Sequence, residues 1–219
     1  MSAHLEITDD IAVLNLGDDE NRFSPDWLTT INGFLARIES GEAKALVTTG
    51  SGKFYSNGLD LDWLAAHSDQ GDWYIDQVHQ LLARVLVAPV PTVAAVNGHA
   101  FGAGSMLGIA HDFRVMRVDR GYFCVPAVDI HIPFSPGMAA LIQAKLTPAA
   151  AVEAMTTGRR YGGADAEAIG LVTATAPEDK VTSAAVDLVM TLKGKDPGTL
   201  QAIKSTMFAS VTAALRGTA

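Results

Sequence analysis

Residues 91–104 have the sequence PTVAAVNGHAFGAG, in which a strand pattern changes into a glycine-rich turn. The small and β-branched residues of Thr92–Val96 predict a buried strand. The apolar residues 105–110, which follow the glycines, predict a helix. A sharp turn from a strand into a helix leaves backbone N–H groups without partners and places them at the positive end of the helix dipole. This turn could therefore receive a negatively charged oxygen atom.

A second glycine turn, SNGLD at residues 56–60, lies shortly after another apolar strand at residues 45–49. Two N–H groups that converge on one oxygen form an oxyanion hole, in which each donor stabilises a transition state by about 3–4 kcal/mol. The alternative is that both turns are plain connections, in which glycine serves only to reach positive φ angles. The turn at residues 97–104 has neither the third glycine of a dinucleotide-binding loop nor the Gly-Lys-Ser/Thr of a phosphate-binding loop.

Strands alternate with helices along the whole chain, which predicts an α/β domain with mostly parallel strands. Ser24 followed by Pro25 is typical of a helix start, because serine caps free N–H groups and proline fits the first helical position. The apolar patterns predict strands at residues 5–8, 11–16, 45–49, 92–96, 113–117, 122–125 and 171–175, and helices at residues 25–38, 60–66, 72–87, 105–110, 135–145, 148–155, 178–192 and 197–215.

The composition excludes several classes of protein. The 219 residues carry a net charge of −8, which disfavours nucleic-acid binding because such binding depends on clustered cations. The only cysteine is Cys124, which leaves no internal disulfide or thiolate zinc site, and no histidine pair has the spacing of a zinc-binding helix, so no metal is expected. No signal peptide is recognised, and the longest apolar stretch, residues 81–96, is interrupted by Arg84, Pro89 and Pro91. We therefore expect a cytoplasmic protein without a membrane span.

Three segments resemble motifs of the crotonase (enoyl-CoA hydratase/isomerase) superfamily. They are KFYSNGLDL at residues 53–61, the glycine-rich segment at residues 91–104, and GRRYGGADAEAIGLV at residues 158–172. The resemblance covers about residues 3–216 and is greatest to the short Δ3,Δ2-enoyl-CoA isomerases. It implies a single crotonase-type domain over residues 1–219, with a ββα spiral up to about residue 190 and a C-terminal helical region from about residue 191. It also implies an enzyme of fatty-acid metabolism that forms a homotrimer or a dimer of trimers.

The resemblance further implies an acyl-CoA thioester as the substrate, with no cofactor apart from the coenzyme A that the substrate carries. The thioester oxygen would lie between the backbone N–H groups of Leu59 and Ala103. The coenzyme A part would lie along residues 57–61, close to Arg22 and Phe23. The residues expected to contact the substrate are Arg22, Phe23, Lys53, Ser56, Asn57, Gly58, Leu59, Asp60, Leu61, Gly102, Ala103 and Met106.

The glutamates that move protons in this superfamily are absent. Met106 stands where hydratases carry one of them, which disfavours hydration but permits isomerisation. Ala127 stands where both hydratases and isomerases carry the other, and alanine cannot move a proton. Asp129 and His131 are candidate replacement bases. Asp129 would face the same side as residue 127 if the segment were extended, and histidine has a pKa near neutrality.

Two other interpretations remain open from the sequence. The chain could bind acyl-CoA without turning it over, as a carrier, a sensor or a subunit. Alternatively, Ser105 could act as a nucleophile in a serine–histidine–aspartate arrangement with His131 or His111, since its segment is faintly similar to the active serine segment of the Clp peptidases. Ser105 could equally be a small residue that lets the helix pack closely.

Overall fold

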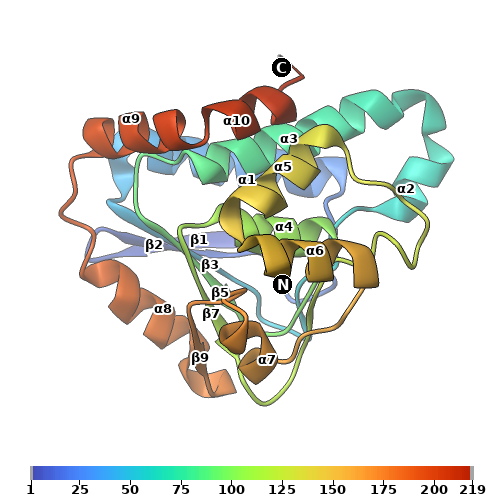
Figure 1. Cartoon of the computed structure of the whole chain (residues 1–219). Coiled ribbons are helices and arrows are strands. Elements are labelled where there is room, and N and C mark those ends of the chain that lie inside the picture. The colour runs from blue at the N-terminus through green and yellow to red at the C-terminus, as the bar shows by residue number, and fades with distance from the viewer. Residues whose placement is uncertain (1, 218–219) are drawn as a thin grey trace.

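The computed structural model describes residues 2–217, which form two sheets flanked by helices (Figure 1). The larger sheet has the strand order β1-β2-β3-β5-β7-β9, and the smaller sheet has the order β4-β6-β8. β1 and β2 pair antiparallel, and all other neighbouring strands pair parallel. The strands are β1 (His4–Thr8), β2 (Ile11–Asn15), β3 (Ala45–Thr49), β4 (Phe54–Ser56), β5 (Thr92–Val96), β6 (His99–Phe101), β7 (Phe113–Arg117), β8 (Phe123–Cys124) and β9 (Ala174–Ala176).

The chain winds through both sheets as a spiral. Each of β3, β5 and β7 is followed in the sequence by one strand of the smaller sheet, and the chain then returns through helices to the larger sheet. This arrangement is the ββα spiral that the family resemblance implies, and two helices follow it at the C-terminal end. Because β4 and β6 pair directly, the turns that follow these two strands emerge next to each other.

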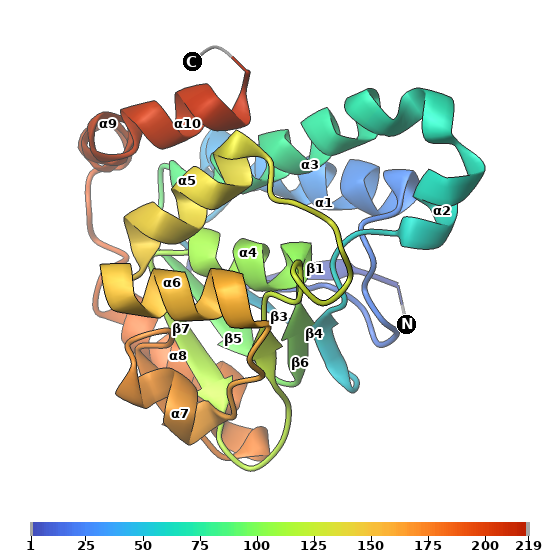
Figure 2. The same cartoon turned by 45° about the vertical axis from the view of Figure 1, so that its right-hand side comes forward.

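Helices cover both faces of the larger sheet. Figure 1 shows α8 below this sheet and α1, α3 and α10 above it. Figure 2 shows α4 between the smaller sheet and α5, and both α4 and α5 contribute buried side chains to the main core. Among residues 2–217, no helix is long and apolar enough to cross a membrane. The helices are α1 (Pro25–Arg37), α2 (Leu61–Ala66), α3 (Gly71–Leu86), α4 (Ala103–Ala110), α5 (Pro136–Lys145), α6 (Pro148–Thr157), α7 (Gly163–Ala168), α8 (Val181–Met190), α9 (Pro197–Met207) and α10 (Ala209–Leu215).

Several helix starts are fixed by side chains. The hydroxyl of Ser24 accepts a hydrogen bond from the Trp27 N–H, directly before the proline that begins α1, as the sequence predicts. The carboxylate of Asp60 accepts from the Trp63 N–H and so begins α2 immediately after the first glycine turn. Each cap satisfies an N–H group that has no partner within its own helix.

The structure corrects two predictions of secondary structure and contains short elements that the apolar patterns do not predict. The last strand lies at Ala174–Ala176 and not at residues 171–175, because the N–H groups of Leu171 and Val172 donate to the Ala166 carbonyl and close the end of α7. The helix predicted over residues 197–215 is interrupted at Phe208, which has a φ of −110° and separates α9 from α10. The short strands β4 and β6, which lie inside the glycine-rich segments, and the helix α7 have no counterpart among the predicted elements.

A buried histidine ties the larger sheet to α4. His111 Nδ1 donates to the Leu107 carbonyl at 2.8 Å, so its Nε2 accepts from the Thr48 hydroxyl at 2.9 Å. The Tyr55 hydroxyl lies 2.7 Å from that of Thr48 and completes the chain of hydrogen bonds. Burial lowers the pKa of His111 from 6.5 to about 4, because the charged imidazolium would lose its hydration.

We expect acid to destabilise the protein through His111. The unfolded chain binds a proton at this residue below pH 6.5, whereas the folded chain binds it only near pH 4. The full stability is therefore present above pH 6.5, and about 3 kcal/mol is lost as the pH falls to 4. Urea unfolding between pH 7 and pH 4.5 measures this loss. His111→Gln removes the titrating group, and a pH slope as steep in this variant as in the unmodified protein would contradict the prediction.

Candidate functional site

The two glycine turns are in contact at the ends of β4 and β6. Gly58, which follows β4, has a φ of +80°. A Cβ atom on this residue would lie 2.7 Å from the Phe101 carbonyl oxygen and 2.8 Å from the Ala103 nitrogen. Glycine at position 58 therefore has two roles, since it adopts the left-handed conformation and also lets the first turn approach the second.

The backbone N–H groups of Leu59, directly after the first turn, and of Ala103, the first residue of α4, donate to no acceptor within residues 2–217. The residues on either side of Leu59 and the residue before Ala103 have occupied donors: the N–H groups of Gly58 and Asp60 donate to hydroxyls at 3.0 and 2.8 Å, and that of Gly102 donates to a carbonyl at 3.0 Å. The positive end of the α4 dipole adds to the field at Ala103. The arrangement can stabilise a negatively charged oxygen atom.

Both of these residues line a cavity of about 390 Å³ with mostly apolar walls. Its lining comes from the glycine turns, from the segment between β8 and α5 and from the start of α5. The apolar residues that line the cavity are Leu59, Leu61, Phe101, Ala103, Met106, Val125, Pro126, Ala127, Ile130, Ile132, Pro133, Phe134 and Met138. A hydrocarbon chain can be buried here, with a polar head against the free N–H groups.

A sequence model described as enoyl-CoA hydratase/isomerase matches residues 6–218. The chain belongs to this family. It is 37% identical over 204 residues to enoyl-CoA delta isomerase 3 of Arabidopsis thaliana, a match that covers 87% of this chain and 84% of the relative. It is 38% identical over 205 residues to the peroxisomal enoyl-CoA delta isomerase 2 of the same plant, covering 87% of this chain and 85% of the relative.

Solved structures of the enoyl-CoA hydratase/isomerase family share the fold. A probable enoyl-CoA hydratase from Mycobacterium tuberculosis H37Rv superimposes with a TM-score of 0.91 at 25% identity, covering 98% of this chain and 92% of that one. A structure described as the apo form of an enoyl-CoA isomerase from M. tuberculosis gives the same TM-score and identity over 99% of this chain and 95% of that one. The crotonase-type α/β spiral with its C-terminal helical region is thus confirmed.

Many residues predicted to lie at the site line the cavity of this family member, namely Arg22, Asn57, Leu59, Leu61, Gly102, Ala103, Met106 and Ala127. Three others lie outside the lining of the cavity. Phe23 is buried and stacks on Trp27 with ring centroids 4.6 Å apart, and the buried Ser56 hydroxyl donates to the Asn21 carbonyl at 2.7 Å. Lys53 is exposed, with its ammonium group 5.2 Å from the centroid of the Phe54 ring.

The two candidate bases do not reach the cavity. Residues 127–131 form a turn, in which the Asp129 N–H donates to the Pro126 carbonyl at 3.0 Å, so the extended geometry assumed for Asp129 is absent. Its carboxylate lies against Gly158, where any side chain would collide with it. His131 is exposed and has a φ of +57°. Neither Asp129 nor His131 is among the residues that line the cavity.

The serine nucleophile is also unsupported by the geometry. Ser105 is fully buried, and its hydroxyl lies 2.6 Å from the Ala100 carbonyl and 2.7 Å from the Cys124 carbonyl. Both ring nitrogens of His111 have partners elsewhere, and His131 is exposed. The serine is therefore a packing residue that joins β6, β8 and α4.

The ionisable side chains that line the cavity are Arg22, Asp62, Cys124 and Arg160. Arg22 pairs with Asp62 at 2.5 Å at one end of the cavity. The Cys124 thiol donates to the Gly158 carbonyl at 3.2 Å, and burial raises its pKa to about 11, so it stays protonated near neutral pH. Arg160 belongs to the third sequence motif, but nothing in that motif indicates that the side chain reaches the cavity. Among the described residues, no group of three or more His, Cys, Asp or Glu is placed to hold a metal ion.

Proposed function

We propose that this chain binds enoyl-CoA thioesters and shifts their double bond slowly, as an isomerase that lacks the usual proton carrier. The observation that supports this proposal is the pair of free N–H groups, on Leu59 and Ala103, at the wall of an apolar cavity. The thioester oxygen would accept hydrogen bonds from both groups. The names of the two Arabidopsis relatives, enoyl-CoA delta isomerases, favour this reaction over others.

The proposed chemistry is polarisation of the thioester carbonyl. Loss of a proton from the carbon next to the carbonyl to a water molecule leaves negative charge on the thioester oxygen, where the two donors stabilise it. Return of a proton from water two carbons further along moves the double bond into conjugation. Ala127 and Met106 supply no group that could carry this proton, so we expect slow turnover.

A second function, binding of acyl-CoA without turnover, is favoured by Ala127 and Met106, because neither side chain can carry a proton. A carrier or sensor needs the cavity and the two N–H groups but needs no base. The two functions are distinguished by incubating the protein with a 3-enoyl-CoA and following the conjugated thioester by absorbance and mass spectrometry. Product that increases with protein concentration supports the isomerase, tight binding without product supports the binding protein, and absence of binding contradicts both.

Ala103→Pro is a direct test of the oxyanion hole. Proline removes one N–H donor but suits the first position of a helix, and glycine at position 102 tolerates the restriction that proline places on its neighbour. We expect affinity for a saturated acyl-CoA to fall about tenfold, because one hydrogen bond to the thioester is lost. Turnover, where present, should fall by about 100-fold or more.

The matched control is Ala103→Gly, which keeps the N–H group. Isothermal titration calorimetry measures the affinity, and circular dichroism checks that α4 is retained. Equal affinity of the proline and glycine variants would contradict the assignment of this N–H group to the thioester oxygen.

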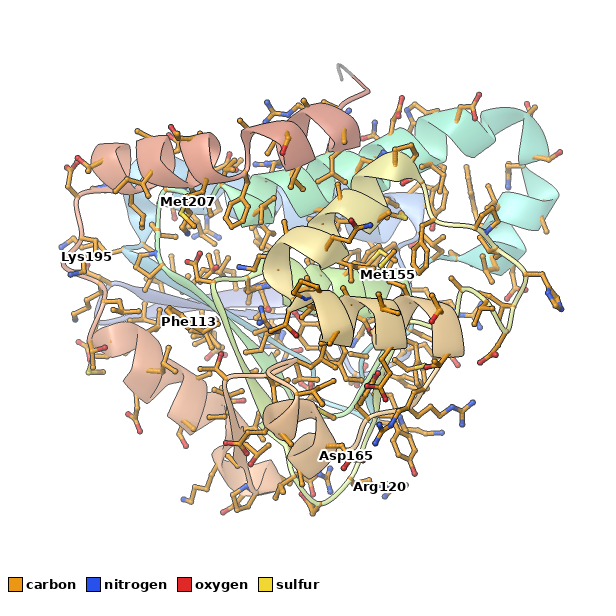
Figure 3. All side chains as sticks on the ribbon, viewed as in Figure 1. Phe113, Arg120, Met155, Asp165, Lys195 and Met207 are labelled. Atoms are coloured by element: carbon orange, nitrogen blue, oxygen red, sulfur yellow. The ribbon has the colours of Figure 1, made fainter. Side chains whose placement is uncertain are left out.

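We also propose that the chain assembles as a homotrimer or a dimer of trimers. The support is the exposed apolar surface of α9, where Ile203 is 52% exposed and Met207, labelled in Figure 3, is 67% exposed. Light scattering coupled to size-exclusion chromatography measures the mass in solution. A monomer would contradict this proposal.

A further inference from the structure

Two hydroxyl groups flank the free N–H group of Leu59. On one side, the Gly58 N–H donates to the Ser56 hydroxyl at 3.0 Å, which belongs to the same turn. On the other side, the Asp60 N–H donates to the Tyr74 hydroxyl at 2.8 Å. Tyr74 lies on α3, outside the turn, so a distant side chain fixes the peptide group that follows the donor.

The Tyr74 hydroxyl is held rigidly by its surroundings. The residue is 0% exposed and belongs to the face of α3 that also buries Val78 and Leu81. Burial raises the pKa of this hydroxyl to about 12, so it is a neutral phenol near neutral pH. A side chain whose rotamer is locked by packing is suited to hold a neighbouring group in one orientation.

The segment that follows Leu59 has little packing of its own. None of the residues Leu61–Ala66, which form α2, is buried. Figure 2 shows α2 beside the N-terminal end of α3, away from both sheets. The Trp63 ring of α2 lies 5.2 Å from the Tyr74 ring, measured between centroids. Tyr74 therefore contacts this segment through its ring as well as through its hydroxyl.

The two free donors come from segments that are far apart in the chain, so they need a common support. Before Leu59, the pairing of β4 with β6 joins the first turn to the strand that leads to Ala103. After Leu59, Tyr74 joins the turn to α3, and α3 packs against α4 in the main core. The Leu59 peptide is thus held on both sides relative to the helix that carries the second donor.

We propose that Tyr74 is a positioning residue of the oxyanion hole, whose hydroxyl holds the Asp60 N–H and so orients the neighbouring Leu59 N–H towards the thioester oxygen. This inference rests on the proposed function. Without the hydroxyl, the Asp60 N–H loses its acceptor, and the peptide groups around residue 59 can rotate. A misplacement of about 1 Å at a reacting group can reduce a rate about 100-fold, so the alignment of the donor matters as well as its presence.

Tyr74→Phe tests this role, because it removes the hydroxyl and keeps the ring against Trp63. We expect amide hydrogen exchange at Asp60, followed by NMR, to become about fivefold to tenfold faster. Affinity for a saturated acyl-CoA should fall about threefold. Turnover of a 3-enoyl-CoA, where present, should fall about tenfold, with a larger effect on kcat than on KM, because the oxygen carries most charge in the transition state.

Infrared difference spectroscopy measures the hydrogen bonds to the thioester directly. The ligand is a saturated acyl-CoA labelled with 13C at the thioester carbon. Hydrogen bonds from the two donors lower the stretching frequency of this carbonyl, so the frequency should be higher in the complex with Tyr74→Phe than in the complex with the unmodified protein. A purely structural role of Tyr74 would leave the frequency unchanged.

Tyr55→Phe is the matched control, because Tyr55 is also 0% exposed and its hydroxyl lies 2.7 Å from that of Thr48 on β3, not at the turn. We expect this variant to lose stability without a change in the carbonyl frequency. The proposal is overturned if Asp60 exchange or the carbonyl frequency is the same in Tyr74→Phe as in the unmodified protein, or if Tyr55→Phe shifts the frequency equally.

Failure of the proposed function gives a different result. If the unmodified protein binds no acyl-CoA, the proposed function is contradicted, and the ligand-free NMR spectra then decide whether Tyr74 positions the Leu59 peptide. Faster exchange at Asp60 together with a shifted Leu59 amide signal in Tyr74→Phe, but not in Tyr55→Phe, would still support the positioning role. Unchanged signals would overturn it.

Discussion

Replacing Ala127 with glutamate should increase the turnover of a 3-enoyl-CoA by about 100-fold or more, the usual contribution of a positioned general base. Ala127 lines the cavity, so a longer side chain at this position can extend towards the substrate. Leu59 and Ala103 already offer their N–H groups at the same cavity. The substitution adds the one group that the proposed reaction lacks.

The glutamate would be surrounded by apolar side chains, including Val125, Ile130 and Phe134. Removal of the carboxylate from water raises its pKa, so the activity gained by the variant should increase with pH through a value above the ordinary one for glutamate. The pH profile of kcat/KM measures this value.

Ala127→Gln is the control, because glutamine has the same size but cannot accept a proton from carbon. Gain of activity in both variants would assign the effect to packing and not to a base. Lack of gain in the glutamate variant, with affinity for the coenzyme A ester intact, would show that position 127 does not face the reacting carbons.

Replacing Gly58 with alanine should disrupt both the fold at the junction and the binding of thioesters. The new Cβ atom would lie under 3 Å from the Phe101 carbonyl and the Ala103 nitrogen, so the two turns must separate. The positive φ adds about 1–2 kcal/mol of strain, and the collision adds about 1–3 kcal/mol. Separation of the turns also moves the Leu59 and Ala103 N–H groups apart, so we expect binding to fall below detection.

Gly170→Ala is the matched control, since Gly170 has a φ of +74° but a Cβ atom added there would meet no other atom within 4 Å. This variant carries the strain of the positive φ without the collision. Urea unfolding of the two variants separates the two contributions. A loss of stability as large in Gly170→Ala as in Gly58→Ala would contradict the close approach of the turns.

The sequence predicts three strands of the larger sheet with the bounds that the structure shows, at residues 45–49, 92–96 and 113–117. The first two contain only apolar residues and threonine, because buried parallel strands leave no alternating polar face to obscure the pattern. The third includes Arg114 and Arg117. β4 and β6 have three residues each beside glycines, too short for any periodicity. Residues 171–175 are apolar for a different reason, since Leu171 and Val172 pack in the core at the end of α7.

The candidate site could be predicted in part. The two glycine turns and the absence of a carboxylate at position 127 are local features, visible in the sequence. The position of the Asp129 carboxylate depends on a turn at residues 127–131 and on contact with Gly158, which lies far along the chain. Cys124 and Arg160 reach the cavity only through the pairing of β8 with neighbouring segments, and sequence periodicity carries no information about such contacts.

The donors at the cavity belong to the main chain, and the pairing of β4 with β6 holds them in place. Almost any substitution leaves a peptide N–H intact, whereas the proton transfer of the proposed reaction would depend on a side chain that a single substitution can remove. Ligand binding through these N–H groups therefore withstands most amino-acid substitutions, whereas the reaction changes when one side chain is replaced. A protein built in this way can lose a reaction, or acquire another, and still hold the same thioester.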